Sequence, residues 1–184
     1  TENMPEFIPE NPGYYNICLE ILDENNCWGD ICKVFTFVSI CNDVVTGYLI
    51  QGTPQSNEVT LSSLLSHPTN PIPHETLANG TIKISNLFVN LDADLIIDVK
   101  TEFVNTDWFC EGGTLIDIRH DLTMKFSNFE ACDQMWKGFK HNFGRNLNMN
   151  DCVIMDAEFG IELSVNAKIR SLRDTFENCY VGIF

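Results

Sequence analysis

The sequence predicts an all-β protein in which a β-hairpin precedes a parallel β-helix. Three observations carry this prediction. Apolar and polar residues alternate near the start of the chain, as they do in a half-buried strand. After residue 80 short β-prone runs recur, and no segment there has the length or periodicity of a helix. Finally, Gly138, Gly160 and Gly182 each precede an apolar residue at equal spacing, since 160 − 138 = 22 and 182 − 160 = 22.

The hairpin is predicted from two strand-forming segments separated by a polar turn. Tyr15–Ile21 alternates apolar with polar residues, Asp23–Asn26 supplies turn residues, and Ile31–Val38 is rich in good strand formers. Cys18 and Cys32 are equidistant from the turn, so we expect them to lie across from one another in the antiparallel pair.

The cysteine content favours an oxidising, extracytoplasmic compartment. The chain has eight cysteines in 184 residues and lacks the paired C-x-x-C spacing of zinc ribbons and thioredoxin-like sites. Cys18, Cys27, Cys32 and Cys41 fall within 24 residues and are the disulfide candidates. Four cysteines allow three pairings, of which we favour Cys18 with Cys32 and Cys27 with Cys41.

The middle of the sequence is predicted to be a boundary. Glycine, proline, serine and asparagine are frequent over residues 42–79, which are assigned to a linker or N-terminal cap. The chain contains no run of eighteen apolar residues, so no membrane span is expected. Because the first residue is Thr1 and no export signal follows it, we expect the chain to be a mature or excised segment.

Residues 80–184 are predicted to form the coils of the solenoid. A period near 22 with several short strands suits one turn of a parallel β-helix, in which each coil buries its apolar residues against the next. Apolar and small residues, spaced by three, precede each repeat glycine, so Cys132, Ala157 and Cys179 are expected to stack as small interior residues. The glycines are expected at coil corners. The predicted strands are Thr81–Ile84, Leu87–Leu91, Leu95–Val99, Thr114–Ile118, Leu122–Phe126, Val153–Met155, Ile161–Ser164 and Thr175–Val181.

Two segments resemble modules of one kind of protein. Asn11–Lys33, with its Pro-Gly-Tyr-Tyr start, alternating strand, Asp and turn, resembles the last two strands of a PKD-type immunoglobulin-like module. Gly113–Phe139 is similar to a recurring segment of large secreted bacterial proteins with right-handed β-helix repeats. The resemblance implies a PKD-like hairpin or partial sandwich over residues 1–41, a right-handed parallel β-helix over 80–184, and a cell-surface protein of the kind exported by type IX secretion.

Charge and motifs limit the function. Eleven Lys and Arg against 26 Asp and Glu give a net charge of −15, which argues against nucleic acid or an anionic membrane as a partner. Asn105-Thr106-Asp107 matches one polygalacturonase motif by letter, but its companion motifs are missing, so a turn role is favoured. No catalytic, cofactor or metal residue is therefore assigned; the many carboxylates are compatible with low-affinity calcium, without a placed site. Metal-ligand spacing is lacking around all four histidines, His67, His74, His120 and His141.

These observations predict a non-enzymatic extracellular structural or adhesion protein, expected to continue beyond residue 184 as part of a larger chain. One alternative is a β-helix that binds or degrades polysaccharide, which a coplanar cluster of Asp or of Lys and Arg on adjacent coils would favour. A second alternative is a self-assembling extracellular fibre subunit, in which solenoid ends stack between molecules. The expected partners are accordingly a surface polysaccharide or other copies of the same assembly.

Overall fold

The computed structural model describes residues 13–22, 28–37, 47–52, 56–132 and 134–184. The chain divides into two compact units, Thr1–Ser39 and Ile40–Phe184, each of which is described by itself.

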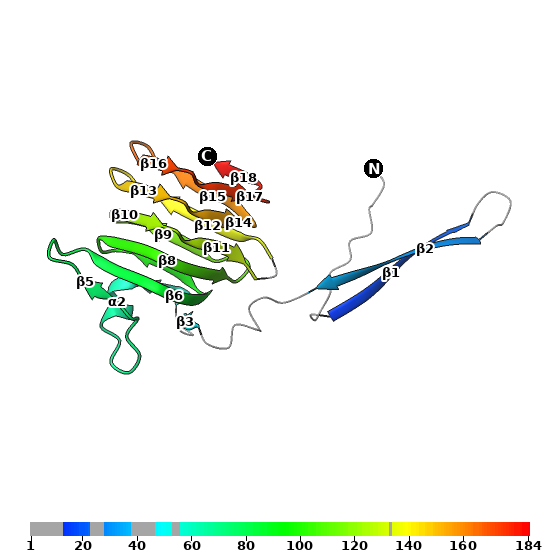
Figure 1. Cartoon of the computed structure of the whole chain (residues 1–184), viewed down its shortest axis with the longest axis horizontal. Coiled ribbons are helices and arrows are strands. Elements are labelled where there is room, and N and C mark those ends of the chain that lie inside the picture. Colours follow the sequence, from blue (N-terminus) through cyan, green and yellow to red (C-terminus); the bar gives the residue numbers. More distant parts are fainter. Residues whose placement is uncertain (1–12, 23–27, 38–46, 53–55, 133) are drawn as a thin grey trace. The chain divides into compact units, whose positions relative to one another are not determined.

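The first unit contains an antiparallel pair of strands (Figure 1). Strand β1 (Gly13–Leu22) pairs with β2 (Trp28–Phe37), and the register places Cys18 directly opposite Cys32. The predicted hairpin and its register are confirmed. The side chains of these two cysteines, together with Cys27 and Cys41, lie outside the described residues, so the disulfide pairing stays a prediction. The described residues 13–22 and 28–37 form a two-stranded sheet only, so the PKD-like sandwich module stays a prediction.

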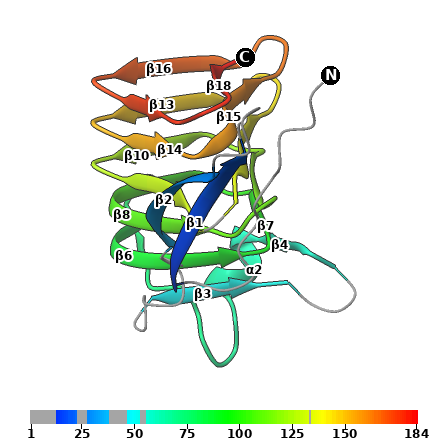
Figure 2. The ribbon, with the colours of Figure 1, turned by 90° about the vertical axis from the view of Figure 1, so that its right-hand side faces the viewer.

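The second unit is a β-solenoid of about five turns, and its described residues are all-β apart from one short helix (Figures 1 and 2). Three columns of parallel strands run along it. The first column contains the first half of β6 (Ile82–Asp92), the first half of β8 (Thr101–Cys110), β10 (Leu122–Lys125), β13 (Asn146–Asn150) and β16 (Lys168–Leu172). The second contains β3 (Tyr48–Gln51), the second halves of β6 and β8, β11 (Asn128–Ala131), β14 (Val153–Met155) and β17 (Thr175–Glu177). The third contains β4 (Glu58–Thr60), β7 (Asp94–Ile97), β9 (Leu115–Ile118), β12 (Trp136–His141), β15 (Ala157–Leu163) and β18 (Val181–Ile183).

One left-handed residue per turn bends the chain from the first column into the second. The strand pairs on either side of these residues are in register, so the residues form a column of their own. Asparagine tolerates this conformation better than most residues and occupies it in the two earliest coils, where the Asn105 side-chain Nδ2 donates to the Asn86 side-chain Oδ1 at 2.9 Å. The column consists of Asn86, Asn105, Phe126, Asp151 and Arg173, with φ between 50° and 57°.

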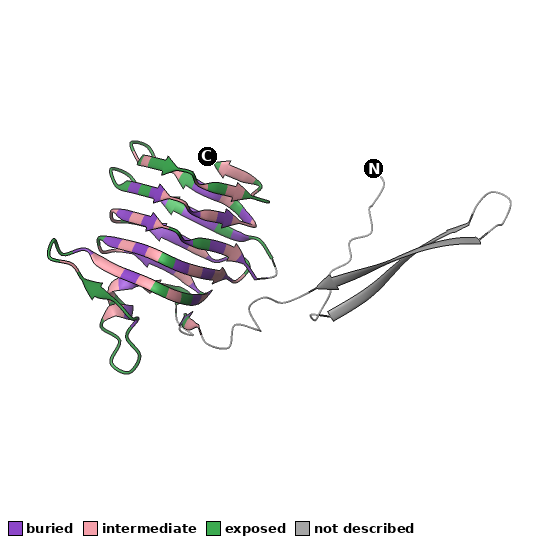
Figure 3. Ribbon diagram, viewed as in Figure 1, coloured by how far each residue is buried: buried purple, intermediate pink, exposed green. Residues whose placement is uncertain are grey.

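The interior is filled by one large apolar residue per turn from the second column. Trp108 stacks on Phe129 with ring centroids 5.7 Å apart, and Phe129 packs edge-on against Phe139 of the third column at 4.8 Å. Burial of this continuous apolar stack against neighbouring turns is what holds one coil on the next. Figure 3 shows the buried positions recurring along successive strands. In register order the stack is Val89, Trp108, Phe129, Ile154 and Phe176.

A short helix covers the N-terminal end of this interior. Helix α2 (Leu61–Leu65) follows β4, buries Leu61 and Leu64, and is capped by the Thr60 hydroxyl, which accepts from the Ser63 amide. Because β3 pairs with β6 and β4 with β7, part of the segment assigned to a linker already belongs to the strand columns. Strand β5 (Glu75–Thr76) pairs antiparallel with the start of β6.

The repeat glycines lie within strands β12, β15 and β18 rather than at the expected corners. Of the three, only Gly138 has a positive φ, at 95°. Gly138 and Gly160 are needed because the coils approach closely there: a Cβ on Gly160 would lie 2.5 Å from the Gly182 carbonyl oxygen and 2.6 Å from the Phe176 ring. A Cβ on Gly182 would make only an ordinary contact, 3.8 Å from the Phe176 side chain.

The expected stack of small residues is placed differently. Ala157 pairs in register with Trp136, not with Cys132. The reason is loop length: residues 132–135 separate β11 from β12, whereas only Asp156 separates β14 from β15. Cys132 and Ala157 are both buried, and Cys179 is partly buried.

Candidate functional site: a hollow on the lateral face

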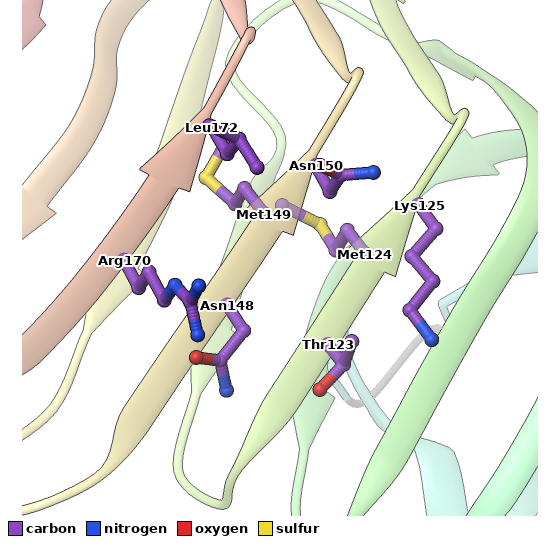
Figure 4. Close-up of a pocket in the computed structure, with 8 residues that line it drawn as sticks. All are labelled: Thr123, Met124, Lys125, Asn148, Met149, Asn150, Arg170 and Leu172. Carbon is purple, nitrogen blue, oxygen red and sulfur yellow. The ribbon is translucent and has the colours of Figure 1, made fainter.

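The first column of strands presents an outward face with a shallow hollow on it (Figure 4). The hollow lies over β10, β13 and β16 and has a volume of about 300 Å³. Its outward side chains form two rows that cross the three strands, and the buried Met124 and Met149 complete the lining. One row is Thr123, Asn148 and Arg170; the other is Lys125, Asn150 and Leu172.

The rows follow from the strand sequences. Side chains alternate between the two faces of a strand, and neighbouring parallel strands lie about 4.8 Å apart. In the Asn146–Asn150 segment, Leu147 and Met149 point into the solenoid, so the three asparagines point outward. In-register stacking then aligns each asparagine with a residue of the coil before and the coil after it.

A second hollow of about 210 Å³ continues the first toward the N-terminal coils. The two share Thr123 and Lys125, so they adjoin along the same face. The Lys125 ammonium lies 2.6 Å from the Glu102 carboxylate, which places this ion pair between the two hollows. Arg170, by contrast, forms no ion pair within the described part of the chain.

Charge is segregated between the lateral faces. The first-column strands carry four basic residues and one acidic residue, although the chain as a whole has a net charge of −15. The second-column strands carry acidic residues only. The first group is Lys83, Lys125, Lys168 and Arg170 with Glu102; the second is Asp92, Asp107, Glu130 and Glu177.

The acidic face is crowded enough to perturb a carboxyl group. Partial burial raises the pKa of Glu130, and the nearby charges of Asp156 and Asp107 raise it further. The residues described contain no group of three or more His, Cys, Asp or Glu side chains arranged to hold a metal ion.

The segment Asn105-Thr106-Asp107, whose sequence matches a polygalacturonase motif, has structural roles in this fold. Asn105 occupies a left-handed corner, and the buried Thr106 hydroxyl accepts from the Trp108 indole at 2.9 Å. Asp107 lies on the second-column face, where it accepts a hydrogen bond from the Asn128 amide at 2.7 Å. The motif therefore shapes the corner and its two flanking strands.

The histidines do not converge. His141 is fully buried at the end of β12, and neither ring nitrogen has a hydrogen-bond partner among the described residues. Burial lowers the pKa of His141, and this effect outweighs the opposing influence of the Arg145 backbone and the Asp121 carboxylate. The ring is therefore neutral at pH 7.

The free thiols are also interior groups. Cys110, Cys152 and Cys179 are free, and burial is the main cause that raises the pKa of each. Since the thiolate is the nucleophile, a raised pKa makes these three cysteines unreactive near neutral pH.

No family model, curated protein or solved structure matches the chain. In the described residues, no helix combines the length and apolar character that crossing a membrane requires.

The residues that line the hollow were not singled out from the sequence. The signal was present, because β13 alternates strictly between outward asparagine and inward apolar residues. Finding the hollow also required the register, which brings Thr123, Asn148 and Arg170 into one row although 47 residues of chain separate the first from the last (170 − 123 = 47).

Proposed function

We propose that this chain is a non-enzymatic extracellular adhesion module that binds a polysaccharide through the lateral hollow. The observation that carries the proposal is the composition of the two rows, in which amides, a hydroxyl and cations cover adjacent coils at fixed spacing. Sugar hydroxyls are bound by such side chains, which both donate and accept hydrogen bonds. A rigid strand lattice holds these side chains in place, so little conformational entropy is lost when a ligand binds.

Adhesion is favoured over polysaccharide cleavage by the chemistry of the hollow. Glycosidases use a pair of carboxyl groups on either side of the scissile bond. The lining of the main hollow contains no Asp or Glu. The neighbouring hollow holds two carboxylates that already have partners: Glu102 forms an ion pair with Lys125, and Asp121 accepts hydrogen bonds from the backbone and side chain of Asn146. Binding without turnover is the function that this set of side chains supports.

The larger setting is also part of the proposal. We place the chain in a secreted, multidomain cell-surface protein with a PKD-like module before a right-handed β-helix, exported by type IX secretion. The resemblances of Asn11–Lys33 and Gly113–Phe139 support this setting, as do the eight cysteines and the acidic composition.

The proposal is tested by retention of the purified chain on columns of immobilised cellulose, xylan, alginate and pectate, each beside the bare matrix. We expect retention on at least one polysaccharide and its loss in a Thr123→Ala, Asn148→Ala double variant, which changes two lining residues that pair in register. The matched control changes Lys140 and Glu162, which pair in register on the third column, to alanine. Elution of the wild type with the void volume from every column, or equal retention of the double variant, would contradict the proposal. Release of reducing ends would favour the enzyme instead.

A further inference from the structure

Phe126 is the unusual member of the corner column. It holds φ at 50°, a conformation that is costly for a bulky residue and that asparagine occupies at the equivalent position in the two preceding coils. The side chain is 55% exposed, and its ring contacts no other aromatic ring among the described residues. Neither aromatic stacking nor backbone preference therefore accounts for phenylalanine at this corner.

The position of Phe126 relates it to the hollow. It directly follows Lys125, and its backbone amide donates to the Asn150 carbonyl oxygen at 3.0 Å. Lys125 and Asn150 both line the hollow, so Phe126 adjoins its rim at the corner end of the two rows, although it is not itself a lining residue. A strained residue with a largely exposed apolar side chain thus lies next to the hollow.

The opposite side of the hollow supplies a cation. Arg170 lies on β16, two coils after Lys125 on β10, and pairs in register with Asn148 (Figure 4). Its guanidinium forms no ion pair within the described residues, whereas the other cation of the hollow, Lys125, is held by Glu102. A planar guanidinium binds a carboxylate through two parallel hydrogen bonds, which a point charge such as an ammonium does not reproduce.

We infer that the hollow binds a polysaccharide containing uronic acid, with one sugar ring stacked on Phe126 and a carboxylate bound by Arg170. The inference rests on the proposed function and names its substrate class. The apolar face of a sugar ring suits the phenylalanine ring, and Asn148 is placed between the two ends to bind hydroxyl groups. The Asn150 side chain is held at the corner instead, because its amide nitrogen donates to Asp151 at 2.7 Å and its oxygen accepts from Arg173 at 3.3 Å. The net positive charge of this face on an acidic chain complements a polyanionic ligand.

The test measures affinity by calorimetry for oligogalacturonate and for the same oligosaccharide with its carboxyl groups reduced. We expect the wild type to bind the acidic form at least tenfold more tightly. Arg170→Gln is expected to weaken binding of the acidic form about tenfold and to leave the affinity for the reduced form unchanged. Arg170→Lys should recover only part of the loss, because the ammonium lacks the guanidinium fork.

Phe126→Asn separates binding from folding. Asparagine suits the left-handed corner, so this variant is expected to melt at the same temperature as the wild type or higher, while losing about tenfold in affinity for both oligosaccharides. Lys140→Gln, on the third column, is the control that should change neither affinity.

Each alternative result overturns the inference. Equal wild-type affinity for the acidic and reduced forms would remove the carboxylate from recognition, while the proposed adhesion function would stand. Unchanged binding in Phe126→Asn would remove the stacking role. If a sulfated heparin oligosaccharide bound more tightly than oligogalacturonate of equal charge, the group that Arg170 recognises would be a sulfate and not the carboxylate of a uronic acid. The chain could also bind neither galacturonate form and still be retained on a neutral polysaccharide column, and that result would overturn only the inference. If no column retained the chain, the proposed function would be overturned as well.

Discussion

Arg173 donates from its guanidinium to both carboxylate oxygens of Asp151 at 2.6 Å, and both residues occupy left-handed corners of successive coils. The pair continues the column that begins with the hydrogen-bonded Asn86 and Asn105. Bonds between adjacent corner residues thus link one coil to the next at two places along the column.

This ion pair predicts a dependence of stability on pH. The Arg173 hydrogen bonds lower the pKa of Asp151, so the folded state holds the charged carboxylate more tightly than the unfolded state does. The contribution is fully present above the unfolded pKa of about 4 and is lost as the pH falls through the lower folded value. In urea titrations we expect Arg173→Gln to be less stable than the wild type at pH 6, with the difference shrinking toward pH 3. Added salt should also shrink it, because the Arg173 side chain is exposed to solvent and that of Asp151 is partly exposed. A difference that stays constant with pH would contradict this role.

The buried imidazole of His141 predicts a second pH dependence. Burial lowers its pKa, so the unfolded state binds a proton more readily than the folded state. Stability is therefore complete above the unfolded pKa of about 6.5 and decreases as the pH falls, by up to about 1.4 kcal/mol for each unit by which the folded pKa is lowered. His141→Leu should remove this slope between pH 7 and pH 5, measured by urea denaturation at each pH. Retention of the slope in His141→Leu would assign it to other groups.

The aromatic interior predicts a large packing effect. Trp108 is fully buried, lies between Phe103 and Phe129, and donates its indole N–H to Thr106. Trp108→Ala is expected to lower the free energy of unfolding by about 3 to 5 kcal/mol, measured by urea denaturation. The control is Phe143→Ala: this residue is 66% exposed, and the change should cost less than about 0.5 kcal/mol. Similar losses in the two variants would show that the interior is loosely packed.

Two glycines with positive φ predict different costs. A Cβ on Gly138 would lie 1.5 Å from the Phe159 carbonyl oxygen, whereas nothing lies within 4 Å of one on Gly80. Gly80→Ala should therefore cost only the backbone strain of about 1 to 2 kcal/mol. Gly138→Ala must in addition separate two coils, and we expect it to cost more than Gly80→Ala, or to prevent folding, as measured by thermal denaturation and circular dichroism. An equal cost would mean that the coils move apart without resistance.

Local pattern was sufficient for part of this fold. The alternation in Tyr15–Ile21 and the turn after it predicted an antiparallel pair with Cys18 opposite Cys32, because hairpin register depends only on neighbouring residues. The recurrence of Phe129, Ile154 and Phe176 before the repeat glycines likewise indicated stacked parallel coils, and these three residues pair in register.

Other strands escaped sequence analysis. Strand β8 lies at the centre of the first two columns, yet it is not among the strands predicted from the sequence. The spacing between stacked residues is the reason: it is 19 residues from Val89 to Trp108 but 25 from Phe129 to Ile154. Loops of different length obscure the period, since a solenoid requires only that its strands align. Strands β12, β13 and β16 were missed as well, and the predicted strand Thr175–Val181 is two strands separated by a turn at Asn178, with φ of 52°.

By itself the sequence determined the all-β class, the hairpin and the presence of stacked coils. Strand alternation and the equal spacing of related residues can both be recognised in the sequence without knowing which strands pair. Only the tertiary structure decided which residues share a face. Register between coils placed Arg170 beside Asn148 and put Phe126 next to Asn150 at the rim of the hollow. It also separated a basic face from an acidic one, within a chain whose overall composition shows only its net negative charge. The physical reason is that inter-coil hydrogen bonds join residues some 20 positions apart, and loop lengths that sequence periodicity does not reveal set that register.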